Sequence, residues 1–490
     1  MVQARNFAWV LSGVILALPC AAGEGDAAPG AAYLAVVRGY ADAMIAGGTD
    51  KYGDITSPLF TSVLDRATLT IPGELPEMKD IRKSDRAYQG GNPMHDECFY
   101  QLLYELSDAT GDARYCEAAD ASLKWFFEHA QSPATGLLAW GEHLYWDFKR
   151  EAMGGNDNHE FYRPWVLYEA SYRLAPETMA RFAEGLWEHQ IANHETGLFS
   201  RHAKWSVHGP GTGAEFPRHG GFYIAQWAEA YKRTGREVYL TAIETLLDYF
   251  ERVRHPVSLA LPAINPQNKD DGAICWPLSQ LSLAVDLGEG AGKVPESLGE
   301  RMRATAQRND VSFLVLPHDL SAPQGGFIAW ARLDLSDVVN DELSQGHTTC
   351  KTWGTGYGQT TNAGAALLCY ERYLQTELPQ YRQLVLDAAR LYLESDPDRG
   401  IELFPGALGE AICLLVAAHR LDAEPQFLAR AQVLAGEAIG LFWDDGPLPR
   451  ASTRTAHYET ITRCDTLARS LLLLWGELNG RQMPTNYLDR

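Results

Sequence analysis

The sequence predicts an all-α protein, an (α/α) toroid or barrel of six to seven helical hairpins. Three features predict this fold: hairpin-like segments that repeat along the chain, short turns within each segment, and long polar loops between segments. A chain of 490 residues with 46% hydrophobic residues can bury the core that such a ring needs. The repeats alone would also suit an open solenoid, and the loop pattern favours the closed ring.

The clearest repeats are residues 102–129 and 226–253. Each reads as a helix, a short turn containing Thr-Gly, and a second helix. Apolar residues in the second helices, at 115–126 and 239–250, recur with spacings i, i+3, i+4, i+7, i+8 and i+11. This spacing predicts amphipathic helices with one wide buried stripe.

Further helices are expected along the rest of the chain. The same stripe recurs at 179–190 and 381–392, with a looser copy at 427–442. Helical segments are also predicted near 31–48, 272–308, 405–420 and 459–478. Period-2 alternation is rare, and residues 311–317, VSFLVLP, are the best strand candidate.

The amino terminus has the pattern of a secretory signal peptide, predicted to span residues 1–22. A basic Arg5 precedes an apolar run that is shorter than a membrane span, and small residues follow it. Residues 23–490 are predicted to form a single (α/α) toroid catalytic domain, because no linker divides them. We therefore expect a secreted or periplasmic protein without a later membrane segment.

Cysteine count and charge exclude several classes of partner. Removal of Cys20 with the signal leaves seven cysteines and no C-x-x-C pair, so a zinc cluster is not expected, and one or two disulfides stay open. The formal net charge of −21 argues against nucleic acid and anionic membranes as partners. An anionic substrate would need a locally positive cleft. The oligomeric state is left open.

Five long loops carry most of the histidines and many of the arginines, tyrosines and tryptophans. They are residues 81–97, 139–165, 199–223, 344–362 and 449–465. In a toroid, such loops gather at one end of the ring and line a cleft, where function usually lies. Aromatic faces suit sugar rings, while Arg, His and Asn suit carboxylates and hydroxyl groups.

Four loop residues suit β-elimination on a uronic acid polymer: Asn158, His159, Arg218 and Tyr223. The C5 proton becomes acidic when Asn or Arg neutralises the neighbouring carboxylate. A histidine or tyrosine can remove this proton, and a tyrosine hydroxyl can protonate the leaving oxygen. These roles need no metal. Taken alone, Asn158 and His159 would more simply be a turn cap and a solvated side chain.

The predicted ring, the loop NDNHEFY and the later FPRHGGFY resemble the helical-toroid polysaccharide lyases. Within that group the chain looks most like polysaccharide lyase family 38, whose members cleave glucuronan or mannuronate-rich alginate. The resemblance implies metal-independent elimination without a cofactor. It makes Tyr223 the base or acid, His159 its partner, and Asn158 with Arg218 the carboxylate clamp. Glu151 and Glu160 are the local acidic groups that could share in neutralising the carboxylate.

The remaining candidates are loop residues that would bind the anionic polysaccharide. For each, a solvated face or a structural hydrogen bond is the simpler alternative. The predicted substrate-binding residues are Arg86, Tyr88, His95, Glu151, Arg201, His202, His219, Lys351, Trp353, Tyr357, Tyr458 and Arg463.

Three other functions remain open at this point. A glycoside hydrolase on the same ring needs two carboxylates ~5–10 Å apart, and the loop acids include Asp85, Asp96, Glu97, Glu142, Asp147 and Asp157. A sugar epimerase would also use histidines, but an export signal disfavours it. A non-catalytic glycan-binding protein would need only the aromatic residues. The sequence leaves the uronic acid, endo or exo attack, and syn or anti elimination undecided.

Overall fold

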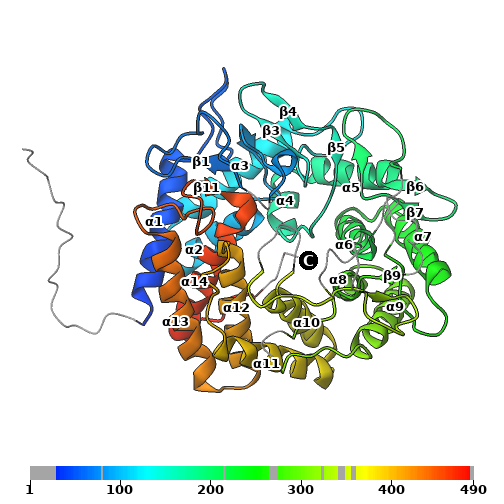
Figure 1. The fold of residues 1–490 in the computed structure, drawn as a ribbon. Coiled ribbons are helices and arrows are strands. Elements are labelled where there is room, and N and C mark those ends of the chain that lie inside the picture. The colour runs from blue at the N-terminus through cyan, green and yellow to red at the C-terminus, as the bar shows by residue number, and fades with distance from the viewer. Residues whose placement is uncertain are drawn as a thin grey trace, which may run out of the picture.

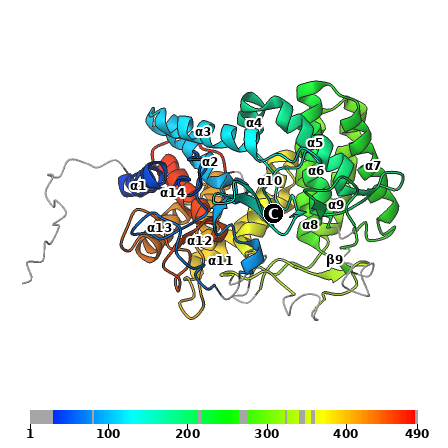
Figure 2. The same ribbon diagram turned by 90° about the horizontal axis from the view of Figure 1, so that it is seen from above.

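The computed structural model of the protein describes residues 29–485 except 79–80, 213–215, 264–273, 322–324, 340–347 and 355–359. The predicted signal peptide, Cys20 and Tyr357 lie outside the described residues. Within the described part, fourteen α-helices alternate between the inner and outer layers of a ring (Figure 1). Figure 2 shows the same ring from above.

Each layer contains seven helices. The inner helices are α2 (Glu97–Thr110), α4 (Tyr168–Leu174), α6 (Pro217–Thr234), α8 (Pro277–Gly290), α10 (Asn362–Thr376), α12 (Pro405–Leu421) and α14 (Cys464–Leu478). The outer helices are α1 (Ala31–Gly47), α3 (Arg114–His129), α5 (Pro176–Gln190), α7 (Val238–Val253), α9 (Glu296–Leu314), α11 (Pro379–Glu394) and α13 (Pro425–Phe442).

Burial explains the two layers. Most residues of α12 and α14 are buried on every side, as expected for helices enclosed by others. The outer α7 buries a stripe that includes Tyr239, Ile243 and Leu246, the spacing that the sequence predicts. The amphipathic interpretation of the second helices is therefore confirmed.

The two ends of the described chain close the ring. Six hairpins follow one another, from α2–α3 to α12–α13, and each joins an inner helix to the next outer helix. The outer α1 packs against the last inner helix, α14, and α14 packs against α2. These contacts make α14 and α1 the seventh inner–outer pair, although no loop joins them. The predicted (α/α) toroid is therefore confirmed.

The strand predicted at 311–317 is wrong, because residues 311–314 belong to α9. Val311 and Val315 are exposed by 56% and 67%, whereas Phe313 between them is buried. Exposed residues four apart lie on one face of a helix, so this apolar run follows helical periodicity. A short run of valine and leucine could not distinguish the two structures.

The strands are short antiparallel pairs in the connections. They are β1 (Val63–Leu64) with β11 (Tyr458–Glu459), β2 (Gly90–Gly91) with β3 (Leu144–Asp147) and β4 (Ala152–Gly155), β5 (Asn158–His159) with β8 (Ala203–Lys204), β6 (Ile191–Asn193) with β7 (Leu198–Phe199), and β9 (Ile274–Cys275) with β10 (Ala331–Arg332). Short 3-10 turns occur at Lys83–Asp85, Ala291–Lys293 and Thr460–Thr462. The pairs β3–β4 and β6–β7 are local hairpins, whereas β1–β11, β2–β3, β5–β8 and β9–β10 join segments that are far apart in the chain.

Three inner helices begin with an aromatic residue followed by proline. Phe216, Trp276 and Phe404 directly precede the first prolines of α6, α8 and α12, and all three have extended backbones. Proline suits the first helical turn, and it excludes the helical conformation from the residue before it. Each of these aromatic residues therefore lies where a long loop enters an inner helix.

Two further expectations concern cysteines and membranes. None of the seven described cysteines forms a disulfide in the structure, so the one or two disulfides left open do not occur among them. Among the described residues, no helix combines the length and the apolar character that crossing a bilayer requires.

Candidate active site

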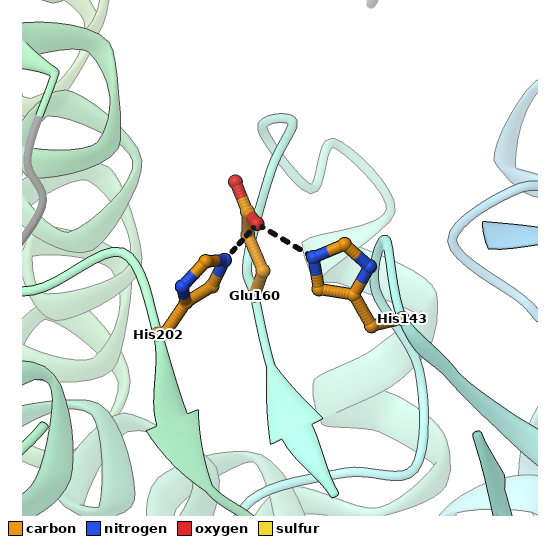
Figure 3. A group of neighbouring side chains, drawn as sticks. All are labelled: His143, Glu160 and His202. Atoms are coloured by element: carbon orange, nitrogen blue, oxygen red, sulfur yellow. Dashed lines mark hydrogen bonds and ion pairs between the residues drawn. The ribbon is translucent and has the colours of Figure 1, made fainter. Parts of the chain in front are cut away.

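A buried carboxylate surrounded by three histidines lies among the long loops. Glu160 has a side chain that is only 1% exposed. Its Oε2 lies 2.7 Å from His202 Nε2 and 3.4 Å from His143 Nε2 (Figure 3). Its Oε1 lies 3.0 Å from His219 Nε2. An isolated buried carboxylate would be costly, so these partners stabilise Glu160 in place. We call these four residues the Glu160 centre.

Long-range pairing brings the centre together. Strands β5 and β8 pair in antiparallel register, with His159 opposite Ala203. Glu160 directly follows β5 and His202 directly precedes β8, so this pairing places the two side by side. His143 comes from the loop before β3, and His219 from the first turn of α6. Residues from two long loops, one of which runs into the start of α6, thus converge at one carboxylate.

Burial and hydrogen bonding shift the pKa values of the centre in opposite directions. Burial alone would raise the pKa of Glu160, but hydrogen bonds from the three histidines hold it well below its usual value. Burial would lower the pKa of His143, but its bonds to Asp85 and Glu160 raise that pKa to about 9. Burial lowers the pKa of His219 to about 4 despite its bond to Glu160. The centre therefore combines an ionised carboxylate with imidazoles in different protonation states.

A second layer of charges orients His143. Its Nδ1 lies 2.9 Å from Asp85 Oδ1, and Asp85 accepts a hydrogen bond of 2.6 Å from Arg82 Nε. Arg82 Nη2 also donates to Glu142 at 2.7 Å. Burial, with repulsion from Glu160, raises the pKa of Glu142 to about 7. In many metal sites, a carboxylate that accepts a hydrogen bond from one imidazole nitrogen orients the ring so that the other nitrogen can bind the metal.

His143, Glu160 and His202 fit a divalent metal ion. One ligand atom from each lies within 4.8 Å of the others, and Figure 3 shows both imidazoles meeting the carboxylate. Imidazole nitrogen with carboxylate oxygen is a donor set that suits zinc, iron or manganese. The sequence predicts no metal, because Asn158, His159, Arg218 and Tyr223 suit the elimination without one. The structure makes the convergence of His143, Glu160 and His202 visible.

The predicted catalytic pair His159 and Tyr223 is enclosed. Both side chains are 0% exposed. Gln190 Nε2 donates to His159 Nδ1 at 2.9 Å, and burial lowers the pKa of His159 to about 3. The Tyr223 hydroxyl donates to the Ser200 carbonyl at 3.0 Å, and burial raises the Tyr223 pKa well above 10. Their predicted catalytic roles remain predictions.

The other two members of that set are more accessible. Asn158 is partly exposed, and its Oδ1 accepts a 2.8 Å hydrogen bond from Lys204 Nζ. Arg218 is also partly exposed, with its guanidinium 4.5 Å from the centre of the Trp276 ring. The structure thus separates the four predicted catalytic residues into an enclosed pair and two partly exposed side chains.

Three predicted binding residues adjoin Glu160. His202 and His219 belong to the centre, and Arg201 Nη1 lies 3.9 Å from Glu160 Oε1. The side chains of Arg201 and His202 are 25% and 30% exposed, so both reach solvent beside the buried carboxylate. The side of Glu160 next to Arg201 and His202 is therefore the side nearest to solvent.

Most other predicted binding residues already have structural partners. Arg86 forms a fully buried ion pair with Glu459, and the Tyr88 hydroxyl donates to the Pro72 carbonyl. The Tyr458 and Tyr40 hydroxyls lie 2.9 Å apart. Further contacts join His95 with Tyr162, Glu151 with the Ile55 amide, Trp353 with Ser395, and Arg463 with Glu410. Lys351 is exposed.

Two residues of the centre were not predicted to be central. Glu160 is predicted from the sequence only as a local acidic group, and His143 is not among the predicted site residues. Both lie in the loop 139–165, which the sequence did single out. His143, Glu160 and His202 have no helical or short-motif spacing, so nothing local could have grouped them.

Comparison with known proteins gives one matching family model and several similar solved structures. A family model described as periplasmic pectate lyase matches residues 80–232, a segment that contains the whole Glu160 centre and Arg201. Similar solved structures include a cellobiose 2-epimerase from Bacillus thermoamylovorans B4167, at 10% identity and a TM-score of 0.49, covering 91% of this chain and 99% of that chain.

Two other similar structures are hydrolases. One is an unsaturated glucuronyl hydrolase specific for heparin, at 9% identity and a TM-score of 0.46, covering 91% of this chain and 98% of that chain. The other is the α-1,6-mannanase GH76A of Salegentibacter sp. HEL1_6, at 10% identity and a TM-score of 0.43. It covers 90% of this chain and 99% of that chain.

Proposed function

We propose that this protein is a secreted or periplasmic polysaccharide lyase that cleaves a uronic acid polymer by β-elimination at the Glu160 centre. The observation that carries the proposal is the convergence of three histidines and Arg201 on one buried carboxylate. The match to a periplasmic pectate lyase model supports it, because the matched segment includes all five residues.

The proposal departs from the sequence prediction on two points: it places the reaction at the Glu160 centre instead of at His159 and Tyr223, and it includes a metal. We assign His143, Glu160 and His202 as ligands of a divalent cation, because their donor atoms converge and Asp85 orients His143. A cation held there would neutralise the substrate carboxylate and so make the neighbouring C5 proton easier to remove. No other cofactor is proposed.

Arg201 is the side chain best placed to meet the substrate. Its guanidinium is partly exposed and lies beside Glu160, so it can bind a uronate carboxylate through paired N–H donors. The same contact strengthens as negative charge develops on that carboxylate during proton removal. His202, also partly exposed, contacts the other carboxylate oxygen of Glu160.

The substrate class proposed is a polyuronate. The resemblance to polysaccharide lyase family 38 favours glucuronan or mannuronate-rich alginate, and the matched family model adds pectate. The formal net charge of −21 does not prevent binding of such polymers, because the electrostatic field near the site matters more than the total charge. Arg201 and Arg218 supply positive charge there.

A screen for unsaturated products tests the proposal. Purified protein with added Mn²⁺ or Zn²⁺ is mixed with glucuronan, polymannuronate, polyguluronate or polygalacturonate, and absorbance is followed near ~230 nm, where the new C4–C5 double bond absorbs. We expect one polymer to give a steady rise that Glu160→Gln abolishes. Glu300→Gln, a matched change at an exposed residue of α9, should keep full activity.

Hydrolysis is the second candidate, because of Glu142. A carboxyl group with a pKa raised to about 7 can serve as a general acid, and it shares a hydrogen bond with Glu160. Two carboxyl groups in direct contact lie closer than the ~5 Å of retaining hydrolases, which favours elimination. New reducing ends without absorbance near ~230 nm would replace the lyase proposal with hydrolysis.

A further inference from the structure

We propose that Arg218, held by an aromatic column of Trp276 and Trp330, forms a second carboxylate-binding subsite beside the Glu160 centre. The protein would then bind two uronates of one polymer, one near Arg201 and another at Arg218. This inference rests on the proposed function and adds a substrate requirement to it, namely a polymer with more than one free carboxylate at the site.

The column begins with the contact between Arg218 and Trp276. The guanidinium carbon lies 4.5 Å from the centre of the Trp276 ring, within the range of a cation–π interaction. Trp330 stacks on Trp276, with ring centres 5.5 Å apart and planes 19° apart. The guanidinium is attracted to the face of the Trp276 ring, and its planar fork of N–H donors is the group that matches a carboxylate in geometry.

Phe216 connects the column to the Glu160 centre. The guanidinium carbons of Arg201 and Arg218 lie 5.2 and 5.9 Å from its ring centre. The Phe216 ring also meets Trp276 edge to face, with centres 5.3 Å apart. The two arginines therefore share one aromatic cluster, and only Arg201 approaches Glu160.

Two neighbouring inner helices hold this cluster rigidly. Phe216 and Trp276 directly precede the first prolines of α6 and α8, and these helices pack side by side. The backbone N–H of Arg218 donates to Ser279 Oγ at 3.0 Å, which joins the two helix starts. A preorganised guanidinium loses little freedom when it binds a ligand, so this arrangement favours carboxylate binding.

The column also lies partly outside the segment that matches the pectate lyase model. Residues 80–232 include Phe216 and Arg218 but neither Trp276 nor Trp330. The two tryptophans are partly exposed, as expected for side chains at the rim of a binding site. We therefore assign substrate selectivity to the column and chemistry to the Glu160 centre.

Steady-state kinetics of Trp276→Leu tests the assignment. The substrates are the cleaved polyuronate and the same polymer with about half of its carboxyl groups methyl-esterified. We expect Trp276→Leu to raise KM on the free polymer about tenfold, to change kcat less than about twofold, and to reduce the preference for the free polymer. Trp276→Phe keeps an aromatic face and should restore most of the affinity.

Two controls separate this effect from damage to the fold. Trp330→Leu removes the outer ring without touching Arg218, and should shift KM in the same direction by a smaller factor. Trp443→Leu changes a partly exposed tryptophan at the end of α13, across the ring, and should leave both polymers' kinetics unchanged. Thermal unfolding of each variant identifies one that has simply lost its structure.

Binding measurements make the two proposals separable. Affinity electrophoresis in gels containing each polymer is run with the wild type, Arg218→Gln and Trp276→Leu. An unchanged KM, preference and gel retardation in a folded Trp276→Leu variant would overturn the subsite and leave the lyase proposal standing. Retardation that depends on Trp276, without any unsaturated product, would overturn the lyase proposal alone. A wild type that neither binds nor cleaves any polyuronate would overturn both.

Discussion

His159 and Glu160 are neighbours in the sequence, yet they occupy two different environments. Glu160 contacts three imidazoles beside the partly exposed side chains of Arg201 and His202. His159 is enclosed, with Gln190 on one ring nitrogen and Phe182 against the ring. Consecutive side chains of an extended segment point to opposite sides, so a polar motif that looks like one site is divided into two.

The difference also concerns charge. Hydrogen bonds hold the pKa of Glu160 well below its usual value, so the Glu160 centre contains a permanent charge. Burial lowers the pKa of His159 to about 3, which keeps that imidazole neutral. A buried charge among several partners can bind a cation or a substrate, whereas a neutral enclosed imidazole most directly stabilises packing. The predictions below challenge this contrast, from the largest expected effect to the smallest.

Removing the charge of Glu160 should have the largest effect. Glu160→Gln takes away the ionised acceptor shared by three histidines, and we expect kcat/KM to fall at least about 100-fold. His202→Ala should act in the same direction. The measurement is product absorbance on the best polymer, with circular dichroism to check folding. Near wild-type activity in folded Glu160→Gln would place the active site elsewhere.

Metal removal should come next. Dialysis against EDTA is expected to abolish most activity, and added Mn²⁺ or Zn²⁺ should restore it, because His143, Glu160 and His202 present converging donors. Atomic absorption after gel filtration should show about one ion per chain in the wild type and less in His143→Ala. Full activity in EDTA would support the metal-independent reaction that the sequence predicts.

The orientation of His143 gives an intermediate effect. Asp85→Asn weakens the hydrogen bond to His143 Nδ1 and should lower metal affinity or activity about 10- to 100-fold. Because the metal ligands themselves remain, raising the metal concentration should recover part of the activity. Titration of activity against free metal measures this recovery, and a loss that no metal concentration relieves would contradict an orienting role.

The enclosed pair should affect stability more than catalysis. Tyr223→Phe removes the hydrogen bond to the Ser200 carbonyl and should lower the free energy of unfolding by about 1–3 kcal/mol, with activity changed only a few-fold. Urea unfolding and kinetics on one preparation test this. A loss of activity above about 100-fold at unchanged stability would instead support the catalytic role that the sequence predicts for Tyr223.

An enclosed histidine away from the centre tests the same idea by pH. His318 lies between the Phe313 carbonyl and the Ile328 amide, and burial lowers its pKa to about 4. Between pH 6.5 and 4 the unfolded chain binds a proton that the folded chain does not, so stability falls as pH falls. Between pH 7 and pH 4, the free energy of unfolding measured with urea should fall by about 2–3 kcal/mol less in His318→Gln than in the wild type. Equal losses would contradict a neutral His318.

The predictable part of the site was its location in the loops. The loop 199–223 contains Arg201, His202, Arg218 and His219, and the structure gathers these residues near Glu160 and Phe216. Arg86 and Tyr458 also lie in long polar loops and were predicted as binding residues. In the structure, however, Arg86 pairs with Glu459 and Tyr458 with Tyr40. Composition cannot tell a substrate contact from a structural one, because both satisfy the same polar groups.

The sequence by itself determined the helices, their buried stripes and the ring, because helical periodicity depends on neighbours a few residues apart. It also determined that long polar loops connect one hairpin to the next. Only the tertiary structure decided that Glu160, rather than His159, meets the histidines, and that His143 joins them. That outcome depends on the pairing of β5 with β8 and on the packing of α6 beside α8, which are contacts between distant segments. A local sequence pattern does not predict such contacts.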